Sequence, residues 1–98
     1  MTTLKLMPDY FCWPLWDETP GAKNYDLGPE DLSISEDLRS ELAHWAGLYD
    51  ATLNLADPRT SGFRSIEDER AFVQQGRKLW QRLSEELQGR AIVEYFYT

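Results

Sequence analysis

The spacing of apolar residues between Ser33 and Gly89 constrains the fold of this chain more than any other sequence feature. The first stripe recurs every three or four residues and consists of Leu38, Leu42, Trp45, Tyr49 and Leu53. A second stripe follows and consists of Phe72, Gly76, Leu79, Trp80, Leu83 and Leu87. This period places side chains on one face of an α-helix, and such a face must be buried. We therefore expect helices near residues 35–54 and 65–88, packed antiparallel as a hairpin.

Polar residues and glycines mark where these helices begin and end. Ser33 or Ser35 is a candidate N-cap for the first helix, and Ser33 forms a capping-box pattern with Glu36. Ser65 is placed to cap the second helix, and Gly89 to terminate it. Gly76 lies inside the second helix, where glycine costs about 1 kcal/mol relative to alanine. The close approach of a Trp or of a neighbouring helix would explain this glycine.

Both ends of the chain read as extended. Residues 90–97 are rich in β-branched and aromatic side chains, which predicts a strand. Residues 4–16 alternate with period two, and Leu4, Leu6, Tyr10 and Cys12 share one face. Pro8 and Pro14 donate no ladder hydrogen bond, so we expect an edge strand or a strand broken by a bulge, not a central strand.

The order of these segments predicts one domain over residues 1–98. A strand, a long loop, two helices and a final strand form an α+β fold of two layers. In it, the antiparallel helical hairpin packs on a small sheet made from the N- and C-terminal strands. A two-layer arrangement covers only one face of that sheet.

Composition excludes several classes of protein. No apolar run approaches the roughly 18 residues of a membrane helix, and the N-terminus lacks the apolar region of a signal peptide. A single cysteine, Cys12, excludes an internal disulfide framework and a cysteine-based zinc cluster. A cytoplasmic location is the expectation.

The negative charge lies mostly in the first half of the chain. Residues 1–49 carry nine acidic and three basic side chains, whereas residues 50–98 carry eight acidic and seven basic ones. An acidic field repels phosphates and anionic lipids, so neither nucleic acid nor a membrane is an expected partner. It attracts a basic protein and speeds the encounter. Plain solubility is the alternative reading of the acidity.

Two neighbouring segments form the candidate binding surface. Residues 17–34 are an acidic loop that Tyr25, Leu27 and a short helical turn at residues 29–32 would hold against the body of the protein. Residues 10–16 are an aromatic cluster that is either exposed beside the loop or covered by it. Aromatic rings among carboxylates are suitable anchors for a basic protein surface. The predicted partner-binding residues are Asp9, Trp13, Trp16, Asp17, Glu18, Tyr25, Asp26, Glu30 and Asp31.

No pattern of catalytic residues is visible. His44 has no nucleophile at a recognisable spacing, and Cys12 has no basic neighbour that would lower the pKa of its thiol. Asp9, Asp17 and Glu18 are weak candidates for a glycosidase carboxylate pair. We therefore predict no catalytic, cofactor-binding or metal-binding residues.

The chain resembles a small bacterial family of about this length. The resemblance rests on Asp9-Tyr10-Phe11-Cys12-Trp13-Pro14-Leu15-Trp16 and on four further segments, residues 32–35, 45–54, 57–63 and 76–79. Some members of the family resemble immunity proteins of contact-dependent or polymorphic toxin systems. The resemblance implies a bacterial, non-enzymatic inhibitor and carries over no catalytic residues.

Together, these observations predict an immunity protein that binds and neutralises a cognate toxin, with a basic nuclease as the suggested target. We expect a monomer or a weak homodimer without a cofactor. Two alternatives stay open: a small enzyme or ligand-binding domain that uses Asp9, Cys12 or His44, and a structural homodimer.

Overall fold

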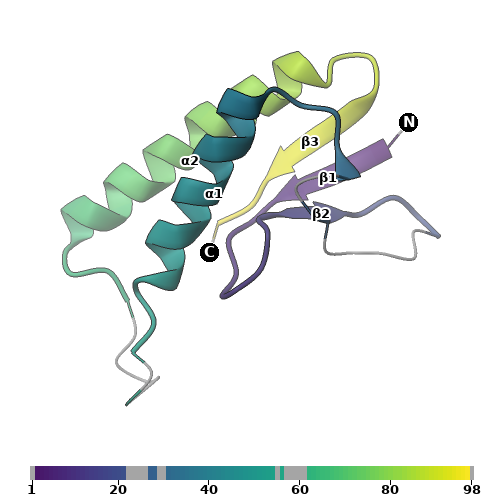
Figure 1. Ribbon diagram of the computed structural model, residues 1–98. Coiled ribbons are helices and arrows are strands. Elements are labelled where there is room, and N and C mark those ends of the chain that lie inside the picture. Colours follow the sequence, from purple (N-terminus) through teal and green to yellow (C-terminus); the bar gives the residue numbers. More distant parts are fainter. Residues whose placement is uncertain (1, 22–26, 29–30, 55, 57–61, 98) are drawn as a thin grey trace.

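The computed structural model describes residues 2–21, 27–28, 31–54, 56 and 62–97. Two helices lie side by side on one face of a three-stranded sheet (Figure 1). The elements in chain order are β1 (Thr2–Leu6), β2 (Leu15–Asp17), α1 (Glu36–Asp50), α2 (Ile66–Glu86) and β3 (Ala91–Tyr95). This arrangement confirms the predicted α+β fold, with the helical hairpin on a sheet made from the two ends of the chain.

The sheet has the order β2-β1-β3, so β1 is its central strand. β1 pairs antiparallel with β2, with Lys5 opposite Trp16, and parallel with β3, with Leu4 opposite Val93. The expectation of an edge strand for residues 4–16 was therefore wrong for β1. The reason is that Pro8 and Pro14, which have no N–H, lie in the connector between β1 and β2, where no ladder hydrogen bond requires one.

Each element contributes its apolar side to one core. In the first helix, the stripe residues Leu38, Leu42 and Trp45 are buried. In the second helix, all stripe residues except Trp80 are buried. Trp80 and Tyr49 are partly buried and pack against the core. The buried hydrophobic side chains are Leu4, Leu6, Leu15, Leu38, Leu42, Trp45, Phe72, Leu79, Leu83, Leu87 and Val93. The helical periodicity therefore identified the buried faces correctly.

Gly76 marks the closest packing between α2 and its neighbours. A Cβ atom at this position would lie 2.6 Å from Cζ2 of Trp45 and would also overlap the hydroxyl of Tyr95. The Trp45 ring stacks on Phe72 with centroids 4.5 Å apart, and its Nε1 donates a hydrogen bond to the carbonyl of Phe72 at 2.9 Å. The predicted close approach of a Trp is confirmed, with Tyr95 of β3 as a second contact.

The predicted ends of the second helix and the start of the first are confirmed, but the first helix was expected to reach residue 54 and ends at Asp50. The chain turns there, with the N–H of Leu53 donating to the carbonyl of Asp50 at 3.1 Å, so Leu53 lies beyond the helix. The hydroxyl of Ser35, and not that of Ser33, caps α1 by accepting the N–H of Leu38 at 3.2 Å. Ser65 caps α2 by accepting the N–H of Asp68 at 3.1 Å. Gly89 follows α2 with a φ of 82°, a left-handed conformation that glycine adopts without strain.

Candidate functional site

Three of the predicted partner-binding residues, Asp9, Asp17 and Glu18, lie at two ends of the sheet. Asp17 is paired with Leu4, and the N–H of Glu18 donates to the carbonyl of Thr3 at 2.8 Å, beside the start of β1. Asp9 lies beyond the opposite end of β1, in the connector to β2. The sheet therefore separates Asp9 from Asp17 and Glu18. Tyr25, Asp26 and Glu30 lie outside the described residues.

The described carboxylates of the acidic loop each hold a local contact. Asp17 accepts the N–H of Thr19 at 2.9 Å, and Asp31 accepts the N–H of Gly28 at 2.7 Å. Glu18 forms an ion pair with Lys5 at 2.7 Å. These contacts shape the chain after β2, while the side chains of Glu18 and Asp31 stay exposed to a partner.

The two tryptophans are half-buried. Trp16 donates a hydrogen bond from Nε1 to the carbonyl of Met7 at 3.0 Å, and Trp13 packs against the core. The acidic loop does contact the body through Leu27, whose N–H donates to the carbonyl of Leu15 at 3.0 Å. Of the large side chains between residues 10 and 16, Phe11 is the exposed one, at 72%.

The face of the sheet opposite the helices carries a second group of residues. Lys5 lies at its centre, opposite Trp16 on β2 and Glu94 on β3, with Nζ 5.4 Å from the ring centroid of Phe96. Ile92 and Phe96 are 55% and 45% exposed. The sequence analysis did not single out Lys5, Ile92 or Phe96. The period-two alternation of residues 92, 94 and 96 was the available signal.

The connector between β1 and β2 is fastened to the C-terminal end of α1. The Tyr10 ring stacks on Tyr49 with centroids 4.7 Å apart, and its hydroxyl lies 3.2 Å from Oγ1 of Thr52. The N–H of Phe11 donates to Oδ1 of Asp50 at 2.8 Å. These contacts join residues about 40 positions apart in the sequence, and together they place Phe11 at the surface.

Several tyrosines gather at this end of the molecule. Burial raises the pKa of Tyr49 above its usual value, and the nearby Tyr10 and Asp9 raise it further. Burial also raises the pKa of Tyr97, with an added contribution from Glu69. Burial raises the pKa of Tyr95 to about 12. These phenols stay protonated at neutral pH, so they add no negative charge, and Tyr95 donates its hydroxyl hydrogen to the carbonyl of Val73 at 2.9 Å.

The residues considered for catalysis are not brought together. His44 is exposed on α1, whereas Cys12 is half-buried in the β1–β2 connector. A hollow of about 480 Å³ opens between the end of α1 and the start of α2, lined in part by Leu48, Phe63 and Phe72. Among the described residues, no group of three His, Cys, Asp or Glu side chains is arranged to hold a metal ion.

Neither helix of the described chain is long and apolar enough to cross a bilayer. No curated protein matches the chain. Over residues 2–98 it matches the family described as Serratia CdiI immunity protein-like. A match over this span agrees with the resemblance carried by the aromatic N-terminal segment and the two helices, and it supports a role in toxin immunity. The chain belongs to the Serratia CdiI immunity protein-like family.

Proposed function

We propose that this chain is a non-enzymatic immunity protein that binds a cognate toxin domain and blocks its activity in the cytoplasm. The observation that carries the proposal is the family match over residues 2–98. We further propose that the toxin presents a basic surface, as a nuclease does where it holds phosphates. The net charge of −7 suits such a partner, because opposite charges steer two proteins together.

The proposed contact surface includes both ends of the sheet. Exposed carboxylates take the place of substrate phosphates, and half-buried aromatic rings offer apolar edges to the toxin. The residues assigned to it are Asp9, Trp13, Trp16, Asp17, Glu18, Tyr25, Asp26, Glu30 and Asp31. Inhibition then requires only that the complex cover the toxin, so no bond is made or broken.

The local contacts of the carboxylates show which substitutions remove their negative charge and keep their hydrogen bonds, so that the effect of the charge on toxin binding can be measured alone. Asp17→Asn and Asp31→Asn keep an oxygen that accepts the N–H groups of Thr19 and Gly28. Glu18→Gln removes only an exposed ion pair, which contributes less than about 1 kcal/mol. The triple variant should fold normally but associate several-fold more slowly with the toxin, and less salt-sensitively.

A matched control changes the net charge by the same amount elsewhere. Asp37→Asn, Glu67→Gln and Glu85→Gln neutralise three exposed acids on the helices. Glu86 is unsuitable as a control because its carboxylate holds Ser35. The control should keep the association rate within about twofold of the wild type. Equal slowing by both triple variants would mean that the acidic loop acts only through net charge.

Protection of cells tests the function directly. Co-expression of the chain with the toxin domain encoded by the neighbouring gene should restore growth, and an unrelated toxin domain should still kill. A toxin gene beside this one supports the proposal, whereas an operon of metabolic enzymes contradicts it. Loss of toxin activity at equimolar chain, without any modification of the toxin, would exclude an enzymatic mechanism.

A further inference from the structure

Phe11 is the most exposed large hydrophobic side chain among the residues that the structure describes. It is also the one described non-glycine residue with a positive φ, at 58°. This left-handed conformation is uncommon for a bulky residue, because its Cβ crowds the backbone. A glycine would adopt the same turn without strain. The conformation therefore has to be held by contacts elsewhere.

Those contacts come from the C-terminal end of α1 and from Thr52, two residues beyond it. Asp50, at the last position of the helix, accepts the N–H of Phe11 at 2.8 Å. The preceding residue, Tyr10, is held by its stack on Tyr49 and by the contact of its hydroxyl with Thr52. The backbone on the N-terminal side of Phe11 and its own N–H are thus fixed, while the ring points away from the core.

The stability of the fold does not explain a phenylalanine at this position. Its ring is 72% exposed, so it gains little from burial, and it takes part in no ring contact with the described residues. A single exposed apolar residue is common on protein surfaces. An exposed bulky residue whose strained backbone is held by side chains far away in the sequence is not common, and strain of this kind is concentrated at functional sites.

The charges beside Phe11 indicate which kind of partner surface it would contact. Asp9 is exposed two residues earlier, and the carboxylate of Asp50 lies against the backbone of Phe11. The connector over residues 7–14 contains no Lys or Arg. Among the described residues, no basic side chain forms an ion pair with either carboxylate. An apolar ring between two acids complements an apolar pocket edged with basic side chains.

We propose that Phe11 is a preorganised anchor that enters an apolar pocket of the cognate toxin, and that Lys or Arg side chains at the rim of this pocket meet Asp9 and Asp50. This inference rests on the proposed immunity function and names its central contact. Asp50 is a positioning residue, since it orders the turn that presents Phe11. Because the backbone that carries the ring is held before binding, little backbone freedom is lost when the complex forms.

The experiment measures binding of the full chain to the toxin domain encoded by the neighbouring gene. Phe11→Ala should weaken the complex by at least about tenfold, mainly through faster dissociation, with an unchanged melting temperature. Ile66→Ala is the matched control, because Ile66 is 71% exposed at the start of α2. This control should change the affinity by less than about twofold.

Two variants of Asp50 separate positioning from charge. Asp50→Ala removes the acceptor, so the Phe11 amide should exchange faster with solvent and the affinity should fall. Asp50→Asn keeps an acceptor oxygen, so amide exchange should stay slow while association with the toxin slows. Faster exchange without any loss of affinity in Asp50→Ala would contradict the positioning role.

The outcomes distinguish this inference from the proposed function. If wild-type chain and Phe11→Ala bind and protect equally well, the immunity function stands and the anchor is wrong. If the wild-type chain neither binds the toxin domain nor protects cells, the proposed function itself is overturned, and the anchor with it. Equal weakening by Phe11→Ala and Ile66→Ala would also overturn the inference, because it would show a general sensitivity to lost apolar surface.

Discussion

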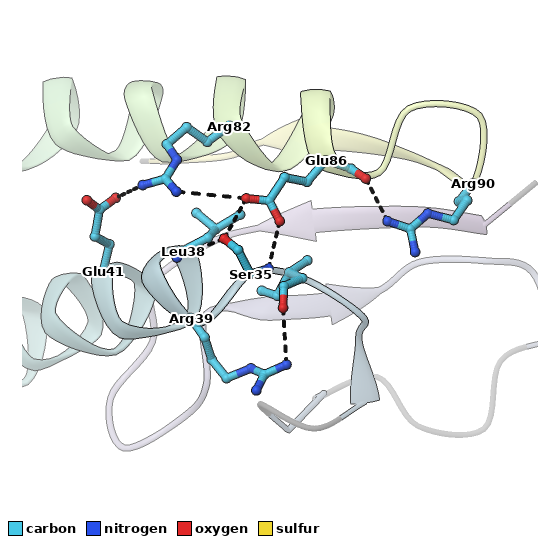
Figure 2. A network of polar contacts seen from close by, with 8 residues as sticks. Ser35, Leu38, Arg39, Glu41, Arg82, Glu86 and Arg90 are labelled. Atoms are coloured by element: carbon cyan, nitrogen blue, oxygen red, sulfur yellow. Dashed lines mark hydrogen bonds and ion pairs between the residues drawn. The ribbon is translucent and has the colours of Figure 1, made fainter.

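The carboxylate of Glu86 on the last turn of α2 accepts two hydrogen bonds from Ser35, one from its N–H and one from its hydroxyl, each at 2.7 Å (Figure 2). Arg82 lies 3.8 Å from the same carboxylate and also pairs with Glu41 of α1. Arg90 bonds the carbonyl of Glu86 at 2.6 Å and that of Ser33 at 3.3 Å. The side chain of Glu86 thus links the start of α1 to the end of α2.

Loss of the Ser35 hydroxyl should destabilise the protein. Ser35→Ala removes both the cap of the Leu38 N–H and one hydrogen bond to Glu86. The expected decrease in the free energy of unfolding is about 1 kcal/mol, which is typical of an N-cap. Ser33→Ala is the control, because the structure assigns the cap to Ser35; it should change stability by less than about 0.5 kcal/mol. Chemical denaturation of the three proteins measures the difference, and equal stabilities would contradict the cap.

The Ser35–Glu86 contact should also depend on pH. The hydrogen bonds from Ser35 hold the pKa of Glu86 below its usual value, and Arg82 and Arg90 lower it further. The folded state therefore prefers the ionised carboxylate. This contribution to stability is fully present above the unfolded pKa of about 4.3, and it is lost as the pH falls through the lower folded value.

Comparison with Glu86→Gln isolates this effect. The stability difference between the wild type and this variant should be constant near neutral pH and should shrink below about pH 4. Thermal unfolding over this pH range provides the measurement. A difference that stays constant down to the most acidic conditions would show that the charge of Glu86 does not contribute.

Two glycines inside helices should respond oppositely to alanine. Gly47→Ala in α1 meets nothing within 4 Å, so it should stabilise the protein by up to about 1 kcal/mol through helix propensity. Gly76→Ala would overlap the Trp45 ring and the hydroxyl of Tyr95, which is itself held by the carbonyl of Val73 at 2.9 Å. Overpacking of this kind costs about 1–3 kcal/mol and should outweigh the gain. Stabilisation by both substitutions would mean that α2 does not approach Trp45 this closely.

Truncation of core leucines tests the contact between the helices and the sheet. Leu42 and Leu83 are fully buried on α1 and α2. Leu42→Ala and Leu83→Ala should each lower the free energy of unfolding by about 2–5 kcal/mol. Leu48→Ala is a control, because Leu48 is 38% exposed and should cost less. Changes within experimental error for Leu42 and Leu83 would remove both residues from the core.

The sequence by itself determined the two helices and their buried faces, because these features follow from local periodicity. It also identified the cap of the second helix, but it left Ser33 and Ser35 open for the first and placed the end of that helix four residues too late. It also indicated that Gly76 needs a close neighbour, although Tyr95 as a second contact emerged only in the fold. Family membership was readable too, since the aromatic N-terminal segment is distinctive.

The tertiary structure alone decided how the ends of the chain pair and what they expose. β1 became the central strand because β3 returns beside it from the far end of the chain, and no local pattern encodes that pairing. At the left-handed turn, the N–H of Phe11 donates to Asp50, which lies 39 residues away. The hydrogen bonds between Ser35 and Glu86 join residues 51 positions apart. Contacts at such separations form only when packing brings the segments together, and for this reason the conformation and exposure of Phe11 followed from the fold and not from the order of residues.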